Sequence, residues 1–351
     1  MVRRAAEADV MPTIGPRRLL AVQAAAHPGG AEVGFLRLAH RLADRGWTVE
    51  LTTPGPGALE DAGLPAHRLP LGGLERGAGA RALLSWAPAR RLARGFDAVY
   101  LNGGVPGRLL PALAGRRTVL HVHDMVGRVP PHWRAASLVL ADSRAVADRL
   151  SGLRAHVVGC PVELDVAPSP PPWPPGGGPL IGFVGRIEPR KGPLDLVRAA
   201  PAIRAGAPGA RIVMVGDDPY AGDPGYLRAV RGAEGVEQYG WAADAPGLMA
   251  HLDVLVAPSR EEPFGTVLAE AMAAGTPVVA TRVDGLPDTV DDGVTGVLVE
   301  PGRPDALAAG VLHVLAHRRA MSAAARAHAQ RFGADAYADR VAGLLCPRTW
   351  R

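Results

Sequence analysis

Short apolar runs alternate along the chain with longer amphipathic ones. The apolar runs are rich in Val, Leu and Ile, which is typical of strands buried on both faces of a sheet. They predict strands at 19–22, 48–52, 97–102, 118–124, 137–143, 180–184, 211–215, 254–257 and 278–281. Helical spacing follows at 33–45, 80–94, from 194 onward, at 266–274 and at 305–345. Strands that alternate with helices predict an α/β fold with parallel sheets.

The segment 168–178, PSPPPWPPGGG, interrupts this alternation. Runs of Pro and Gly disfavour both helix and strand, so the segment predicts a linker. At 351 residues the chain is long for one hydrophobic core and sufficient for two. We therefore expect one domain at 1–167 and a second at 179–330, with a helical segment at 331–351.

The stretch 253–280 predicts one strand, loop, helix, strand unit, whose loop ends at Gly265 and whose helix begins at Thr266. Parallel sheets bind ligands at this carboxyl edge, and free N–H groups at a helix start favour anions. Glu262 in the loop and Glu270 in the helix would suit sugar or ribose hydroxyls. Their spacing alone also allows an ordinary helix-start acid and a solvated surface acid.

Two other strand ends carry candidate binding residues. Gly29 and Gly30 follow the first strand, where missing side chains let backbone approach a ligand, although a tight turn would also use them. They do not form a dinucleotide fingerprint. Arg186 and Lys191 follow the strand at 180–184 and would suit a diphosphate. A solvated loop is the alternative for both.

Lys191 stands out because the chain has 38 Arg and this single Lys. An ammonium and a guanidinium are not interchangeable at a phosphate, so a retained Lys is a candidate phosphate ligand. Chance survival of one Lys is the alternative.

His121 and His123 lie on one face of the strand at 118–124. A metal site would need further ligands close by, and the local sequence offers none. His123, at the carboxyl end of the strand, is better placed to contact a substrate. An ordinary loop histidine is the alternative.

Composition excludes several classes of protein. Aromatic residues make up 5% of the chain, which argues against base-stacking platforms for nucleic acid. Two cysteines give no disulfide framework or zinc pattern and suit a reducing cytoplasm. Since no apolar run approaches the ~20 residues of a membrane span and the N-terminus does not resemble a signal peptide, we expect a cytoplasmic protein.

The net charge of +5 is unevenly placed. Residues 1–165 hold 21 Arg and 14 acidic residues, so their net charge is +7. The remainder holds 18 basic and 20 acidic residues, so its net charge is −2. A basic first half suggests an anionic acceptor or contact with an anionic membrane surface at the inner face. Scattered solvated arginines explain it equally well.

Several of these motifs together resemble one family. The run S-R-E-E-P-F-G-T-V-L-A-E-A-M-A-A-G-T-P-V-V-A resembles the Glu-x7-Glu region of the retaining glycosyltransferases of family 4, which have the GT-B fold. The segments G-G-A-E, V-L-H-V-H-D and G-R-I-E-P-R-K-G resemble other motifs of that family, in the same order. The resemblance covers nearly the whole chain, from Gly29 to about Gly296.

The resemblance implies a GT-B protein of two Rossmann-like domains that face a central cleft. The first would bind the acceptor, the second a nucleoside-diphosphate (NDP) sugar with UDP or GDP, and the C-terminal helix would cross back to the first. Catalytic roles fall to Glu262, His123, Arg186 and Lys191. Donor-binding roles fall to Gly29, Gly30, Arg186, Lys191, Trp241, Glu262, Phe264, Gly265, Thr266 and Glu270. The resemblance implies neither a bound metal nor a cofactor, the NDP-sugar being a co-substrate.

This sequence departs from the family at four positions. Cys160 stands where relatives usually have Asn, and Asp218 where they often have Gly. Asp284 and Asp288 depart from a loop that usually reads G-G-x-x-E, and Asp288 shortens the acid. An NDP-sugar epimerase of the same architecture and a non-catalytic nucleotide-sugar binder remain alternatives, whereas nucleic-acid binding is not expected.

Overall fold

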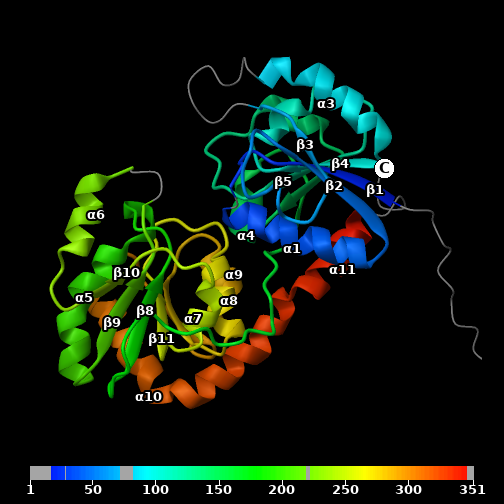
Figure 1. Ribbon diagram of the computed structural model, residues 1–351. Helices are drawn as coiled ribbons and strands as arrows, with labels where there is room; N and C mark the ends of the chain where they lie inside the picture. Colours follow the sequence, from blue (N-terminus) through cyan, green and yellow to red (C-terminus); the bar gives the residue numbers. More distant parts are fainter. Residues whose placement is uncertain (1–16, 28, 72–81, 219–221, 346–351) are drawn as a thin grey trace, which may run out of the picture.

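The computed structural model describes residues 17–27, 29–71, 82–218 and 222–345. They form two lobes, each built on a parallel sheet that is covered by helices (Figure 1). This arrangement confirms the predicted α/β class and the two Rossmann-like units. Within these residues, no helix combines the length and apolar character that crossing a bilayer requires.

The sheet of the N-terminal lobe has the strand order β3-β2-β1-β4-β5-β6-β7, and its neighbouring strands pair in parallel. Its strands are β1 (Arg17–Val22), β2 (Trp47–Thr53), β3 (Ala66–Arg68), β4 (Ala98–Asn102), β5 (Thr118–Val122), β6 (Leu138–Ala141) and β7 (Ala155–Val157). The strands predicted from the sequence end in this lobe at 137–143 and do not include β7. This strand pairs with β6, and its short, partly exposed sequence gave no hydrophobic signal.

The sheet of the C-terminal lobe has the order β10-β9-β8-β11-β12-β13 and is also parallel. Its strands are β8 (Leu180–Val184), β9 (Arg211–Val215), β10 (Glu237–Tyr239), β11 (Val254–Ala257), β12 (Val278–Thr281) and β13 (Gly296–Val299). Four of them, β8, β9, β11 and β12, have the predicted bounds.

The helices follow the amphipathic runs. They are α1 (Gly30–Asp44), α3 (Trp86–Leu92), α4 (Arg144–Arg149), α5 (Pro193–Gly206), α6 (Pro224–Arg231), α7 (Ala245–Met249), α8 (Thr266–Ala273), α9 (Leu286–Thr289), α10 (Pro304–Ala329) and α11 (Ala334–Leu345). Short 3-10 turns are η1 (Ala93–Gly95), η2 (Pro106–Leu109), η3 (Pro131–Ala135), η4 (Pro189–Lys191) and η5 (Gln330–Phe332). The predicted helical stretch at 80–94 begins partly outside the described residues.

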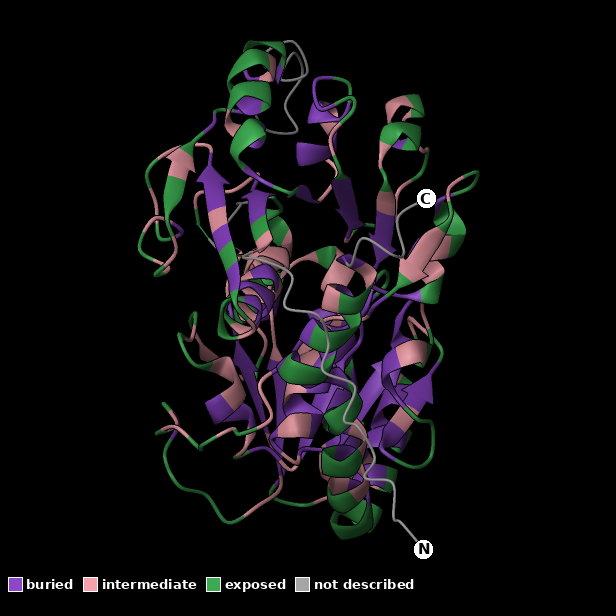
Figure 2. Cartoon of the chain, turned by 90° about the vertical axis from the view of Figure 1, so that its right-hand side faces the viewer, coloured by how far each residue is buried: buried purple, intermediate pink, exposed green. Residues whose placement is uncertain are grey.

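Alternation along the strands explains how each sheet buries both faces. In β1, Leu19 packs with α1 and α11 on one face, whereas Leu20 packs toward α3 on the other. Burying one such side chain contributes about 1.5–3 kcal/mol. Figure 2 shows the buried strands enclosed between layers of half-exposed helices.

The chain passes between the lobes twice, at neighbouring places. Val162, on the way out of the N-terminal lobe, forms a parallel bridge with Gly333, which lies between η5 and α11. The N–H of Val162 donates to Phe332 and the N–H of Ala334 donates to Val162. The α11 helix then packs against α1, where Tyr337 and Val341 are buried (Figure 1).

The segment 168–178 packs against the C-terminal lobe. Trp173 is buried in the core of the C-terminal lobe and lies edge-on to Tyr239. The carbonyl of Ser169 accepts a hydrogen bond from His251. The segment therefore lies against the second sheet, after the crossing at Val162.

Candidate functional site

The strand orders locate the candidate site. In the N-terminal lobe the order reverses between β1 and β4, and in the C-terminal lobe between β8 and β11. Loops on either side of such a reversal part and leave a crevice at the carboxyl edge of the sheet. In the second lobe these loops carry Lys191, after β8, and Glu262, after β11.

Lys191 and Glu262 contact each other directly. Gly192, with φ of 66°, lets the Lys191 loop approach β11, because a Cβ there would lie 2.1 Å from the carbonyl oxygen of Pro258. The Nζ of Lys191 forms an ion pair with Oε2 of Glu262, and these side chains are 18% and 11% exposed. The structure thus joins two residues that are far apart in sequence into one partly buried pair.

Arg186 belongs to the same loop as Lys191. One of its guanidinium nitrogens lies 3.2 Å from Oε1 of Glu188, and Arg190 approaches the same oxygen at 3.1 Å. The side chains of Arg186 and Arg190 are both 32% exposed. The loop itself holds three cations and one acid, Glu188, and the two other acids that contact its cations, Glu261 and Glu262, come from the loop after β11.

The start of α8 closes the other side of the crevice. Gly265 precedes the helix with φ of 88°, and a Cβ there would lie 2.5 Å from a methyl carbon of Leu286. Thr266 is the first helical residue, so its backbone N–H belongs to the unpaired set at a helix start. Phe264 is buried and packs edge-on against Phe332, so its side chain anchors the loop in the core.

Glu270 lies on α8 and pairs with a residue of the other lobe. Its Oε1 accepts a hydrogen bond of 2.7 Å from the guanidinium of Arg37 on α1. Burial raises the pKa of Glu270, and the charge of Arg37 opposes that rise. Arg37 is a site residue that sequence reasoning missed.

The glycine pair of the first lobe forms the start of α1. The backbone N–H of Gly29 donates to the carboxylate of Glu32 over 3.0 Å, which closes a helix cap. A Cβ on Gly30 would meet no atom within 4 Å, so open space lies beside this residue. Backbone at Gly30 can therefore be approached from outside.

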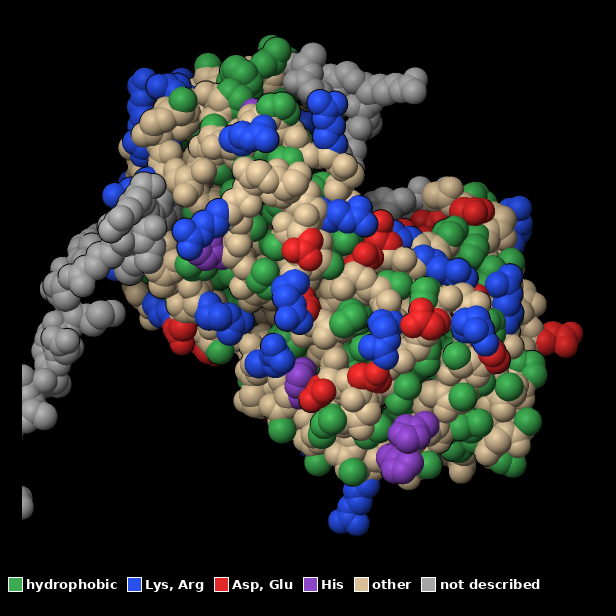
Figure 3. Space-filling view, turned by 180° about the vertical axis from the view of Figure 1, so that it is seen from behind, with side chains coloured by type: hydrophobic (Ala, Val, Ile, Leu, Met, Phe, Trp, Pro, Cys, Tyr) green, Lys and Arg blue, Asp and Glu red, His purple; other side chains and the backbone are tan. Residues whose placement is uncertain are grey.

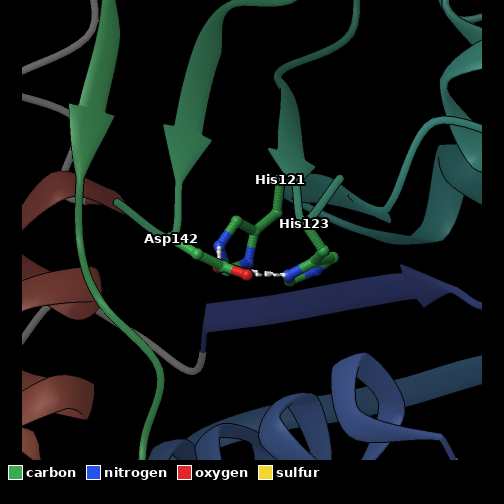
Figure 4. Close-up of side chains that lie close together, drawn as sticks. All are labelled: His121, His123 and Asp142. Carbon is green, nitrogen blue, oxygen red and sulfur yellow. Dashed lines mark hydrogen bonds and ion pairs between the residues drawn. The ribbon is translucent and has the colours of Figure 1, made fainter. Parts of the chain in front are cut away.

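His121, His123 and Asp142 form a compact cluster at the carboxyl ends of β5 and β6 (Figure 4). Nε2 of His121 lies 2.8 Å from Oδ1 of Asp142, and Nδ1 of His123 lies 2.9 Å from Oδ2. Nδ1 of His121 faces the hydroxyl of Tyr100 at 2.5 Å, and Nε2 of His123 faces Oδ1 of Asn102 at 2.7 Å. Both nitrogens of His123 thus have a hydrogen-bond partner, whereas Nε2 of His121 lies close to Asp142 without the geometry of a hydrogen bond.

The cluster distributes its protons unequally. Burial would raise the pKa of Asp142, but the two histidines outweigh it and hold that pKa well below its usual range. Burial and the neighbouring His123 lower the pKa of His121 to about 4. Burial lowers the pKa of His123 as well, yet Asp142 more than compensates and the net shift is upward. The cluster therefore favours a neutral His121, whereas Asp142 favours the charged form of His123.

The expectation that no further ligand lies near the histidines was wrong. Ligand atoms of His121, His123 and Asp142 all lie within 4.8 Å of one another, a grouping that could hold a metal ion. The signal was available in the sequence, because His123 and Asp142 follow consecutive strands, which pair in the sheet. Hydrogen bonds to Tyr100 and Asn102 tie both histidines to β4, and Nε2 of His121 is left as the one ring nitrogen of the cluster without a hydrogen bond.

Cys160 connects the two lobes at this point. Burial and the nearby Asp142 raise the pKa of its thiol, which also contacts the hydroxyl of Thr266. The His123 cluster of the first lobe and the start of α8 in the second therefore meet at one junction. In Figure 3 acidic and basic side chains intermingle around the waist between the lobes.

Trp241 borders a separate hollow at the end of β10. The hollow has a volume of about 510 Å³ and is lined by Tyr239, Trp241, Asp244 and two prolines of the segment 168–178. The Trp241 side chain is 66% exposed, an unusual state for so large an apolar group.

Two departures from the family pattern have structural roles. Asp284 adopts a positive φ of 40°, a conformation that glycine adopts more easily, and its carboxylate accepts the backbone N–H of Glu262. Asp288 accepts hydrogen bonds of 2.7 Å from the backbone and side chain of Arg144, at the start of α4 in the other lobe.

Comparison with known proteins gives a consistent result. A family model described as Glycosyl transferases group 1 matches residues 178–317, and one described as Glycosyltransferase Family 4 matches residues 28–166. The D-inositol 3-phosphate glycosyltransferase of Stackebrandtia nassauensis is 31% identical over 410 aligned positions, covering 94% of this chain and 91% of the relative. The match to the protein of that name in Segniliparus rotundus is 40% identical but covers 47% of this chain and 38% of that relative.

A third relative, the 2-deoxystreptamine N-acetyl-D-glucosaminyltransferase of Streptomyces fradiae, is 38% identical over 60% of this chain and 50% of its own length. Among solved structures, Anabaena Alr3699/HepE in complex with UDP-glucose has a TM-score of 0.77 and 26% identity, covering 93% of this chain and 99% of that one. Sucrose-phosphate synthase from Thermosynechococcus elongatus shares the fold, with a TM-score of 0.79.

Proposed function

This chain belongs to glycosyltransferase family 4, and from that premise we propose that it transfers a sugar from an NDP-sugar to an acceptor hydroxyl with retention of configuration. UDP is the favoured nucleotide, because the Anabaena relative is described in complex with UDP-glucose. The observation that carries the proposal is the Lys191–Glu262 pair beside the start of α8.

The pair suits a donor that brings both a diphosphate and a sugar. A diphosphate placed at Thr266 would take the ammonium of Lys191, with Arg186 and the helix N–H groups adding to the positive field. Glu262, released from Lys191, would accept hydrogen bonds from sugar hydroxyls. The same cations would stabilise the charge that develops on the leaving diphosphate as the glycosidic bond breaks.

Glu270 and His123 would position the ribose and the transferred sugar. Glu270 would accept the ribose hydroxyls, and the hollow beside Trp241 would receive the base. His123 is held by Asp142 and Asn102 at the edge that faces the transferred sugar. The leaving phosphate would take the proton of the acceptor on the same face, so that proximity and charge stabilisation supply most of the rate.

A donor screen tests this proposal. UDP- and GDP-sugars would be incubated with cyclitol and sugar acceptors, and the products analysed by mass spectrometry for mass and by NMR for anomeric configuration. We expect transfer with retention, and loss of transfer in Lys191→Ala and Glu270→Ala. Unchanged transfer in both variants would refute the site. Isomerisation of the donor without acceptor would indicate an epimerase, and binding without turnover a non-catalytic protein.

A further inference from the structure

Three arginines form a row along one face of α1. Arg37, Arg41 and Arg45 are spaced four residues apart, so they lie one helical turn above another. Each is partly buried, with side-chain exposures of 14%, 25% and 27%. Arginine carries its charge at any relevant pH, so a row like this requires acidic partners.

The partners of the row change along the helix. Arg45 pairs with Asp335 and Asp339 of α11, which packs on the same lobe as α1. Arg41 pairs with Glu163, in the segment where the chain leaves that lobe. Arg37 pairs with Glu270, on α8 of the other lobe. Of the three, Arg37 makes the contact that joins the lobes.

Arg37 is held rigidly in that contact. One terminal nitrogen donates to the carbonyl of Pro161 over 2.9 Å, and the other donates to Oε1 of Glu270 over 2.7 Å. The two bonds fix the plane of the guanidinium and therefore the position of the carboxylate it meets. Pro161 neighbours Val162, where the chain crosses between the lobes, so the anchor lies at the crossing itself.

Glu270 keeps accepting capacity after it binds Arg37. An ionised carboxylate offers about four lone-pair sites, and Arg37 occupies one of them. A vicinal diol can donate to the free sites without displacing the guanidinium. Burial disfavours ionisation of Glu270, and the positive charge of Arg37 favours it. The net pKa shift is upward, so Arg37 offsets part of the cost of charging the buried acceptor while it also orients it.

We propose that Arg37 is a positioning residue of the donor site, through which the N-terminal lobe orients Glu270 of the C-terminal lobe for the ribose hydroxyls of the nucleotide. The inference rests on the proposed function, because Glu270 must meet the ribose. If Arg37 has this role, the N-terminal lobe helps to hold the donor. The donor site is then complete only while the two lobes are in contact.

The test measures how much affinity the ribose hydroxyls contribute. Calorimetric titration of the full chain with UDP and with 2′,3′-dideoxy-UDP gives a ratio of dissociation constants. In the wild type we expect the dideoxy ligand to bind roughly tenfold to a hundredfold more weakly, as for lost hydrogen bonds to a charged group. In Arg37→Gln we expect this ratio to fall to about threefold or less, mainly through weaker binding of UDP.

Matched variants exclude a general structural effect. Arg45→Gln removes a cation from the same face of α1, and its partners lie within one lobe, so the wild-type ratio should persist. Arg37→Lys keeps the charge but loses one of the two fixed bonds, and its ratio should lie between those of wild type and Arg37→Gln. It also serves as the test variant should Arg37→Gln not fold.

The variant Glu270→Gln separates the proposed role of Arg37 from the proposed contact of Glu270 with the ribose. If Glu270→Gln lowers the ratio while Arg37→Gln and Arg37→Lys keep the wild-type value, the role of Arg37 is overturned and the proposed donor site stands. If Glu270→Gln also keeps the wild-type ratio, or the wild type does not distinguish the two ligands, the ribose assignment itself fails and the role of Arg37 fails with it.

Discussion

The charged side chains at the carboxyl edges of the two sheets differ in how far they are buried and in how they are paired. In the N-terminal lobe, His121 and Asp142 are 4% and 5% exposed and belong to a buried cluster that is held by hydrogen bonds to Tyr100 and His123. In the C-terminal lobe, Lys191 and Arg186 are 18% and 32% exposed and form ion pairs with Glu262 and Glu188. We therefore expect the first edge to be the more costly to disturb, and on the proposed function the second edge would exchange its acidic partners for the diphosphate of the donor.

Removing the charge at the centre of the buried edge should have the largest effect. Asp142→Asn leaves His123 without its anionic partner, and breaking a buried pair in this way costs about 3–5 kcal/mol of unfolding free energy. Urea denaturation followed by circular dichroism measures this loss. Asp148→Asn, at an exposed position of α4, is the control and should change stability by less than about 0.5 kcal/mol. A loss below about 1 kcal/mol in Asp142→Asn would show that the buried edge is not a rigid frame.

Removing the Lys191 cation at the edge of the C-terminal sheet should lower the rate of catalysis more than the stability of the fold. We expect Lys191→Ala to lower kcat for sugar transfer by about 10²–10³, as when one group that stabilises a developing oxyanion is lost. Arg198→Ala, which removes an exposed cation from α5, should keep wild-type rates. Initial-rate kinetics with a saturating donor measures both variants. Should Lys191→Ala lose as much stability as Asp142→Asn, the contrast between the edges would not hold.

The buried edge should also make stability depend on pH. The pKa of His121 is about 4 in the folded chain and about 6.5 when unfolded, so the unfolded chain binds more protons between these values. Stability should therefore fall as pH decreases from 6.5 to 4, by at most about 1.4 kcal/mol per pH unit. The raised pKa of His123 acts in the opposite sense, because its contribution is lost as pH rises through that value.

Urea denaturation across this pH range tests the assignment. His121→Gln should flatten the slope between pH 6.5 and pH 4, whereas His317→Gln, at an exposed position of α10, should leave it unchanged. An unchanged slope in His121→Gln would place the acid sensitivity elsewhere in the chain.

The smallest effect is expected at an exposed pair between the lobes. Arg144 is 76% exposed where it meets Asp288, and such pairs are screened by solvent and salt. We expect Arg144→Ala to leave the melting temperature unchanged within error at 0.15 M salt. A clear decrease, measured by differential scanning fluorimetry, would mean that the contact between the lobes depends on surface charge as well as on buried pairs.

Much of the fold could be predicted because its signals are local. The strands β8, β9, β11 and β12 have their predicted bounds, since each is a buried apolar run that ends at turn residues. The edge strand β7 was missed, because a short strand at the rim of a sheet need not be apolar. Loops that follow neighbouring strands share one edge, which is why Lys191 and Glu262 could be proposed for one site.

The sequence alone determined which residues stand at strand ends and which motifs they form, because chain periodicity and turn chemistry act over a few residues. The tertiary structure decided which of these side chains meet. The contact of Arg37 with Glu270 joins positions 233 residues apart, and that of His123 with Asp142 joins positions 19 apart. The Arg37–Glu270 pairing has no signal in the sequence, since the crossing at Val162 brings these groups together, whereas His123 and Asp142 follow consecutive strands and meet because those strands pair. Burial then sets their charges, because desolvation and partner charge exist only once the chain is folded.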